Sequence, residues 1–409
     1  MDWSFLIRNK SALNVTTDSR KVTPGCVFVA LKGEHFDGND FVEQAKADGA
    51  EYIISGENAL KDLQDLARAW RRELNIPVLG ITGTNGKTTT KELCAAVLKT
   101  KYNLYYTQGN LNNSLGVPLT LLSITRAHEM AIVEMGASHP GDIKELVEIA
   151  EPNYGLITNV GRAHLQGFGS FEGVMKTKAE LYDWLVAHQG IVFRNADNPY
   201  LQEMYQSAKR SVLCQQSDLC SVSEAILYHT GVMPEGTHLV GGYNAENVSA
   251  AICVGSYFGV REEDALAAIR AYVPSNNRSQ LMQTEKNTVV VDAYNANPTS
   301  MQAAIEAFDK SPITNNQLPM PQAYILGAMR ELGDYSHLEH QNIVNMLLER
   351  KADKVLLVGE EYKQTTAPYP VFDDVEALCR QLEKEPLKGY RILLKGSRSN
   401  QLEKVIPLL

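Results

Sequence analysis

The stretch "GITGTNGKTTTKE", residues 80–92, combines glycines, a lysine and hydroxyl side chains after the apolar run "IPVL" and before "LCAAVL". A glycine-rich turn between a strand and a helix presents backbone N–H groups and the helix N-terminus to a phosphate. Gly83 and Gly86 permit such a backbone, Lys87 can reach the outer phosphates, and the Thr88 hydroxyl can bind Mg²⁺. The pattern therefore predicts a phosphate-binding loop, of which Thr84, Asn85 and Thr89 are the remaining members.

The general pattern G-x-x-x-x-G-K-[ST] requires glycine at position 81, where this chain has Ile81. An ordinary glycine-rich turn with a solvated lysine is thus the alternative. The strand before the loop and the helix after it favour the phosphate site. A lysine beside a threonine hydroxyl suits a triphosphate and its metal, so ATP is expected rather than a dinucleotide.

Three further side chains could take part in chemistry on an anion. Glu134 ends a predicted strand, where ligand-binding side chains of an open α/β sheet usually lie, although a solvated loop carboxylate would look the same. His164 follows the next strand, and a lone histidine is more often structural than a ligand. Lys178, in "KTKAEL", would ordinarily be a solvated charge on a helix.

The elements that must position these residues alternate between strands and helices. Apolar strands are expected at 78–82, 130–134 and 155–160, and again at 288–292, 322–326, 354–358 and 391–394. Such alternation is typical of parallel α/β architecture. The chain "LLKGSRSNQLEKVI" is read as strand, loop and helix, with the loop at the helix N-terminus.

Three α/β domains are predicted. The first, residues 1–76, is small and mixed; the second, 77–276, has a parallel sheet like that of P-loop ATPases; the third, 277–409, is Rossmann-like. A chain of 409 residues is too long for one ordinary core, which agrees with this division.

Composition limits the classes of function. A hydrophobic content of 44% and a charged content of 21% are those of a globular enzyme. The net charge of −9 argues against general affinity for nucleic acid or anionic membranes. No apolar run approaches the ~20 residues of a membrane span. The six cysteines include no C-x-x-C pair. A cytoplasmic protein with reduced thiols is expected.

Several motifs occur together in one order along the chain. They are "TDSRKVTPGCVFVALKGEHFDG", "TGTNGKTT", "GNLNN", "EMGASH", "GYNAENVSAAI", "NNRSQL", "VDAYNANPTS" and "LKGSRS". With them the chain resembles the Mur ligase family, and most closely the members that join D-alanyl-D-alanine to UDP-N-acetylmuramoyl-tripeptide. The resemblance implies an ATP-dependent ligase of peptidoglycan precursor synthesis that forms an acyl phosphate.

The resemblance assigns catalytic roles to Lys87, Glu134, His164 and Lys178. It implies two Mg²⁺ ions, with Thr88 and Glu134 as ligands of Mg²⁺ and His164 in contact with a second ion. Lys178 matches a carbamylated lysine, and CO₂ adds only to an unprotonated amine, whose ordinary pKa is about 10.4.

By the same resemblance, the nucleotide contacts Asn244, Asn247, Arg278, Asp292 and Asn295. Side-chain amides suit an adenine edge because they both donate and accept hydrogen bonds. Tyr243 stands where the family usually has histidine. Residues such as Asn295 could instead serve turn chemistry.

The resemblance also implies sites for the other substrates. The UDP end would meet the first domain, at Ser19 and Arg20. The path from there to the catalytic centre would be lined by Asn110, Asn112 and Asn113. The incoming dipeptide carboxylate would bind Lys395, Ser397 and Arg398, for which the alternative is a capped helix with solvated cations.

Two rival functions remain open at this stage. A sister ligase, or a folylpolyglutamate synthase, would add a single amino acid. An inactive nucleotide-binding scaffold is disfavoured by the joint presence of Lys87, Glu134, His164 and Lys178. A monomer acting on small molecules, with no nucleic acid partner and no membrane insertion, is expected.

Overall fold

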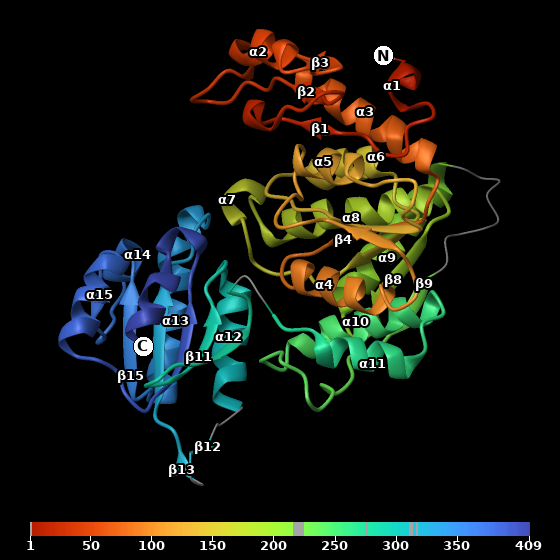
Figure 1. Ribbon diagram of the computed structural model, residues 1–409. Coiled ribbons are helices and arrows are strands. Elements are labelled where there is room, and N and C mark those ends of the chain that lie inside the picture. The colour runs from red at the N-terminus through yellow and green to blue at the C-terminus, as the bar shows by residue number, and fades with distance from the viewer. Residues whose placement is uncertain (1, 216–224, 275–276, 311–313, 316–317) are drawn as a thin grey trace.

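A computed structural model describes residues 2–215, 225–274, 277–310, 314–315 and 318–409. Figure 1 shows three α/β units in chain order, from the red and orange N-terminal unit to the blue C-terminal one. The predicted fold class, with a parallel central sheet and a C-terminal α/β unit, is confirmed. No helix in these ranges has both the length and the apolar character needed to cross a bilayer.

The N-terminal unit is built on a parallel sheet of three short strands in the order β1-β2-β3. Its long helix α3 carries an apolar face that includes Leu63, Leu66 and Trp70. These side chains share one core with Val117 and Leu121 of the central unit. The elements are α1 (Ser4–Ile7), β1 (Val15–Thr16), β2 (Val27–Val29), α2 (Val42–Ala47), β3 (Tyr52–Ile54) and α3 (Ala59–Leu74).

The central unit has a six-stranded parallel sheet in the order β5-β6-β4-β7-β8-β9. Alternate residues of β4 face opposite sides, so Val78 packs with α5, α6 and α8, and Leu79 packs with α4 and α10. The strands are β4 (Val78–Thr82), β5 (Leu104–Tyr106), β6 (Met130–Glu134), β7 (Tyr154–Ile157), β8 (Ile191–Asn195) and β9 (Ala225–Tyr228). The helices are α4 (Lys87–Leu98), α5 (Gly116–Leu122), α6 (Asp142–Ala150), α7 (Leu165–Phe168), α8 (Phe171–Ala187), α9 (Pro199–Gln215), α10 (Asn244–Tyr257) and α11 (Glu262–Ala271).

The C-terminal unit has a six-stranded sheet in the order β10-β11-β17-β14-β15-β16, in which only the edge strand β10 is antiparallel to its neighbour. The strands are β10 (Gln280–Gln283), β11 (Thr288–Asp292), β14 (Gln322–Gly327), β15 (Lys354–Val358), β16 (Val371–Phe372) and β17 (Arg391–Lys395), with a separate pair β12 (Thr314–Asn315) and β13 (Leu318–Pro319). The helices are α12 (Pro298–Lys310), α13 (Ser336–Arg350), α14 (Glu360–Lys363) and α15 (Val375–Lys384).

The predicted strands agree with these elements, and the strands at 78–82, 130–134, 288–292 and 354–358 match them residue for residue. The predicted boundary at 276–277 falls next to residues 275–276, which lie outside the described ranges. The boundary at 76–77 falls between α3 and β4. Both domain boundaries stay predictions.

The expected helix after the "LKGSRS" loop is wrong. The chain forms a three-residue 3₁₀ turn, Arg398–Asn400, followed by a 3₁₀ segment, Leu402–Leu408. Gln401, between them, has φ 49°, a left-handed conformation that cannot continue a right-handed helix. A dipole argument for an anion site therefore does not apply there.

Candidate functional site

The predicted phosphate loop joins β4 to α4 and lies at one end of a cavity of about 780 Å³. Gly83 has φ 142° and Gly86 has φ 78°, backbone angles that residues with a side chain rarely adopt. A Cβ on Gly83 would lie 1.9 Å from the Thr158 hydroxyl, and one on Gly86 would lie 2.5 Å from Asn247 Oδ1. Both glycines are therefore required by the close approach of neighbouring residues as well as by the backbone.

Side chains from the segment that follows β7 hold the same loop. Asn159 Oδ1 accepts a hydrogen bond from the Asn85 backbone N–H at 3.0 Å, and the Thr158 hydroxyl donates to the Asn85 carbonyl at 2.6 Å. Lys87 Nζ donates to the carbonyls of Gly83 (2.7 Å) and Thr84 (3.0 Å). The loop is thus fixed before any ligand is considered.

The cavity collects most of the predicted residues from two units of the chain. Its central-unit lining comprises Thr84, Asn85, Gly86, Lys87, Thr88, Thr89, Asn110, Asn112, Asn113, Glu134, His164, Asn244 and Asn247. Its C-terminal lining includes Arg278, Asp292, Asn295 and Lys395. Residues up to 311 positions apart in sequence therefore share one cavity.

Glu134 is the buried carboxylate nearest the loop. Its Oε1 accepts hydrogen bonds from the Thr88 hydroxyl at 3.1 Å and from the Asn112 amide at 2.8 Å. Its Oε2 is buried and has no hydrogen-bond partner among the described residues. A hydroxyl beside an under-coordinated carboxylate fits the hard oxygen-ligand preference of Mg²⁺.

Two lysines have lowered pKa values: Lys87, which lines the cavity, and Lys178, which is buried and is not among the lining residues. Burial lowers the pKa of Lys87 to about 8, against the effect of the Glu134 carboxylate, which raises it. Lys178 is only 2% exposed, and burial, with the charge of Lys87, holds its pKa well below the ordinary value. A depressed lysine pKa makes the neutral amine available, which is the form whose lone pair attacks the carbon of CO₂.

His164 lies between the central and C-terminal units. It has φ 51°, it precedes α7, and its Nδ1 contacts the carboxylate of Glu331. Burial lowers the pKa of His164, and the nearby Glu331 carboxylate opposes that effect. Across the described part of the chain, no three histidine, cysteine or acidic side chains form a metal site by themselves.

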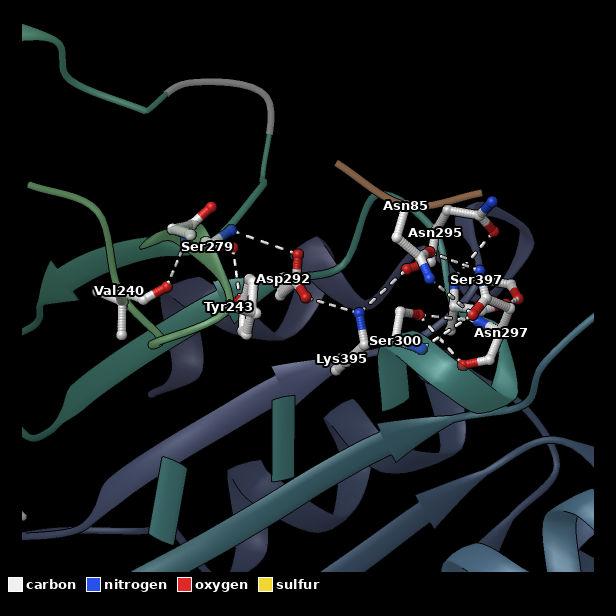
Figure 2. A network of polar contacts seen from close by, with 12 residues as sticks. Asn85, Val240, Tyr243, Ser279, Asp292, Asn295, Asn297, Ser300, Lys395 and Ser397 are labelled. Atoms are coloured by element: carbon white, nitrogen blue, oxygen red, sulfur yellow. Dashed lines mark hydrogen bonds and ion pairs between the residues drawn. The ribbon is translucent and has the colours of Figure 1, made fainter. Parts of the chain in front are cut away.

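Figure 2 shows how the C-terminal residues reach the central unit. Lys395 Nζ donates to Asp292 Oδ2 at 2.6 Å, and Asn297 Nδ2 donates to Asn85 Oδ1 of the phosphate loop at 2.8 Å. The Tyr243 hydroxyl lies 2.6 Å from the hydroxyl of Ser279. Polar contacts therefore join the two units at the loop and next to Arg278.

In the predicted adenine segment, Asn247 Nδ2 donates to Asn244 Oδ1 at 2.9 Å, and Thr90 donates to Asn247 Oδ1 at 2.9 Å. The Arg278 guanidinium lies 3.7 Å from the centre of the Tyr294 ring. Tyr294 was not singled out by sequence, although it stands inside the quoted motif "VDAYNANPTS".

Other predicted residues lie away from this cavity or inside the protein. Ser19 and Arg20 form a 3₁₀ turn of the N-terminal unit, where Arg20 pairs with Asp18. The Ser397 hydroxyl accepts from the Arg330 backbone N–H at 3.1 Å. The Arg398 side chain, 65% exposed, lies 6.0 Å from the Tyr294 ring. Roles for these residues stay predictions.

Sequence reasoning missed Lys91 and Glu331. Lys91 follows Thr88 by three residues and so lies on the same face of α4, a spacing that could have indicated it. Glu331 reaches His164 only through the placement of the C-terminal unit, and no local pattern signals that.

Known proteins share both the sequence and the fold. Family models described as Mur ligase family, catalytic domain; Mur ligase middle domain; and Mur ligase, glutamate ligase domain match residues 13–97, 81–255 and 277–398. The UDP-N-acetylmuramoyl-tripeptide–D-alanyl-D-alanine ligase of Escherichia coli is 34% identical, over 97% of this chain and 93% of its own. That of Bacillus subtilis is 32% identical, over 96% and 92%.

Among solved structures, the MurF ligase of Thermotoga maritima in complex with ADP has a TM-score of 0.81 and 27% identity, and the match covers 98% of each chain. MurF from Acinetobacter baumannii has a TM-score of 0.80 and 27% identity, over 96% of this chain and 92% of that one. With a cavity built around the phosphate loop and with similarity along almost the whole length, this chain belongs to the Mur ligase family.

Proposed function

We propose that this protein uses ATP to join D-alanyl-D-alanine to UDP-N-acetylmuramoyl-tripeptide, the two substrates that the names of its relatives give for them. The observation that carries the proposal is the shared cavity, in which the phosphate loop faces residues of the C-terminal unit. The ADP complex of a similar MurF supports nucleotide binding by this fold.

The reaction has two balanced steps. The tripeptide carboxylate attacks the γ-phosphorus, which gives an acyl phosphate and ADP. The dipeptide amine then attacks the acyl carbon, loses a proton and displaces phosphate. Both carboxylate and triphosphate are anions, so cations must hold them together. Lys87, which lines the cavity, would neutralise charge on the outer phosphates.

Thr88 and Glu134 would hold a magnesium ion, because their oxygens converge and Glu134 Oε2 lacks a hydrogen-bond partner among the described residues. The ion would neutralise phosphate charge in the transition state. His164 and a carbamate on Lys178 would hold a second ion. The low pKa of Lys178 supports that modification.

We assign the nucleotide to the phosphate loop together with Asn244, Asn247, Arg278, Asp292 and Asn295. The UDP end goes to residues 1–76, at Ser19 and Arg20, with Asn110, Asn112 and Asn113 along the path to the cavity. The dipeptide goes to residues 277–409, where Arg398 is the exposed cation. Lys395 would contribute to this dipeptide site through Asp292, with which it forms a largely buried ion pair. A cytoplasmic monomer is proposed.

The test is phosphate release from ATP with the UDP-tripeptide and a panel of amines: D-Ala-D-Ala, D-Ala, D-Glu, L-Lys and diaminopimelate. Release that requires the dipeptide supports the proposal. Release with a single amino acid would assign a sister activity instead. Silence with every amine, despite nucleotide binding, would indicate a scaffold.

Arg398→Ala tests the dipeptide site. Its KM for D-Ala-D-Ala should rise at least tenfold, because a charge-assisted hydrogen bond to a carboxylate contributes about 1.5–3 kcal/mol, whereas its KM for ATP should change little. Equal effects on both constants would contradict the assignment. Arg380→Ala, on α15 of the same unit, is the matched control.

A further inference from the structure

Lys91 is a buried cation that the proposed reaction does not use. It lies on α4 and has 0% exposure. Its Nζ lies 3.2 Å from Glu92 Oε1 and 3.6 Å from Glu134 Oε2, but makes no hydrogen bond to any described residue. Burying an ammonium group without a hydrogen bond costs free energy, so hydrogen bonding does not explain why a lysine is buried at this position.

The two oxygens of Glu134 have different surroundings. Oε1 receives hydrogen bonds from Thr88 and Asn112. Oε2 has only the charge of Lys91 facing it and no hydrogen bond from the described residues. The Thr88 and Asn112 bonds fix the carboxylate by themselves, and Lys91 therefore contributes charge more than geometry.

The charges around the loop are balanced before a ligand arrives. Lys87 and Lys91 lie near Glu134, and Glu92 lies near Lys91. A divalent cation entering at Glu134 alone would meet two lysines and a carboxylate that is already paired, without an excess of negative charge at that carboxylate. The phosphates of a nucleotide would supply that excess.

We propose that Lys91 is the resident counter-ion of Glu134, which competes with Mg²⁺ for this carboxylate, so that the metal binds together with the nucleotide and not before it. Lys91 then acts through the charge that it places beside Glu134, and it sets the order in which Mg²⁺ and the nucleotide bind. This inference rests on the proposed function, because it takes Glu134 as the metal carboxylate of an ATP-dependent ligase.

The experiment measures binding rather than turnover. Mn²⁺, as a paramagnetic substitute for Mg²⁺, is titrated into the full-length protein without nucleotide, and free Mn²⁺ is followed by electron paramagnetic resonance. The variants are Lys91→Met and Lys91→Gln, the latter retaining a polar end that can reach Glu134. Lys99→Met is the matched control, since Lys99 lies at the end of the same helix and over the same Tyr106 ring.

Lys91→Met and Lys91→Gln should each bind Mn²⁺ at least about tenfold more tightly than the wild type, because a like charge close to the ion has been removed. Lys99→Met should bind like the wild type. A merely structural lysine would leave Mn²⁺ affinity unchanged or weaker. Unchanged or weaker Mn²⁺ affinity in a folded Lys91 variant would overturn the proposal.

A second titration separates this inference from the proposed function. ADP is titrated calorimetrically with saturating Mg²⁺ into the wild type. If the wild type binds ADP but the Lys91 variants show no gain in Mn²⁺ affinity, the counter-ion inference fails and the proposed function stands. If the wild type binds no ADP under any condition, the proposed function fails.

Discussion

Gly86→Ala should separate backbone strain from the close approach of Asn247. The new Cβ would lie 2.5 Å from Asn247 Oδ1, where ordinary contacts begin near 3.4 Å, so the amide must move by about 1 Å. That amide is held by hydrogen bonds to Thr90 and Asn244. Losing both bonds costs about 2 kcal/mol of folding stability. The displaced amide would also lose its proposed hydrogen bonds to the adenine, which is worth about 2 kcal/mol, or about 30-fold in affinity for ADP.

Gly141→Ala is the matched control. Gly141 also precedes a helix of the central unit, its φ of 89° is close to the 78° of Gly86, and a Cβ there would meet nothing within 4 Å. Both variants should lose about 1–2 kcal/mol of stability from the left-handed conformation, and the thermal midpoint of Gly86→Ala should fall further because Asn247 also loses its two hydrogen bonds.

Calorimetry with ADP and Mg²⁺ then gives the decisive comparison. Only Gly86→Ala should bind about 30-fold more weakly, through the displaced Asn247. The reasoning is refuted if Gly86→Ala binds ADP as the wild type does. It is refuted equally if Gly141→Ala loses as much affinity as Gly86→Ala, because strain alone would then explain the effect.

Three further outcomes follow from the same structure. With ¹³C-bicarbonate, NMR should show a carbamate signal in the wild type and in Lys176→Arg but not in Lys178→Arg. The signal should fade as pH falls, because protonation of the amine reverses the addition. An unchanged spectrum in Lys178→Arg would contradict this prediction. Asn297→Ala removes the hydrogen bond to Asn85, which is worth about 1 kcal/mol, so kcat should fall about fivefold while ADP affinity is retained. An equal loss of ADP affinity would count against a role of Asn297 in joining the two units. Buried His340 has a lowered pKa, so the unfolded chain binds a proton at this residue more readily than the folded one. The free energy of unfolding should therefore drop as pH falls below about 6.5, by at most about 1.4 kcal/mol per pH unit. Thermal melts of His340→Gln should show a shallower dependence of the midpoint on pH, and the same slope as in the wild type would refute the assignment.

Local patterns predicted what local interactions determine. The phosphate loop was readable because Gly83, Gly86 and Lys87 stand between an apolar strand and a helix, and the strand at 130–134 placed Glu134 at its end. Four strands of the C-terminal sheet also followed from their apolar runs, whereas the antiparallel edge strand β10 was not predicted. By contrast, a helix beginning near Arg398 was expected, but the left-handed Gln401 separates two 3₁₀ segments, Arg398–Asn400 and Leu402–Leu408.

Contacts between distant segments were not readable from the sequence. Lys178 looks like a solvated lysine on a helix, and only its burial in the folded chain lowers its pKa. The pair Asn85–Asn297 joins residues 212 positions apart and depends on how the C-terminal unit is placed. Lys91 required knowledge that Glu134 Oε2 faces α4. Burial and tertiary placement decide these features.

The central claim is ligation through an acyl phosphate. The most direct test uses UDP-N-acetylmuramoyl-tripeptide labelled with ¹⁸O in its terminal carboxylate, together with ATP, Mg²⁺ and D-Ala-D-Ala, and mass spectrometry of both products. The account predicts the pentapeptide product together with inorganic phosphate that carries one ¹⁸O atom. Unlabelled phosphate, or a labelled product that forms only with a single amino acid, would contradict it.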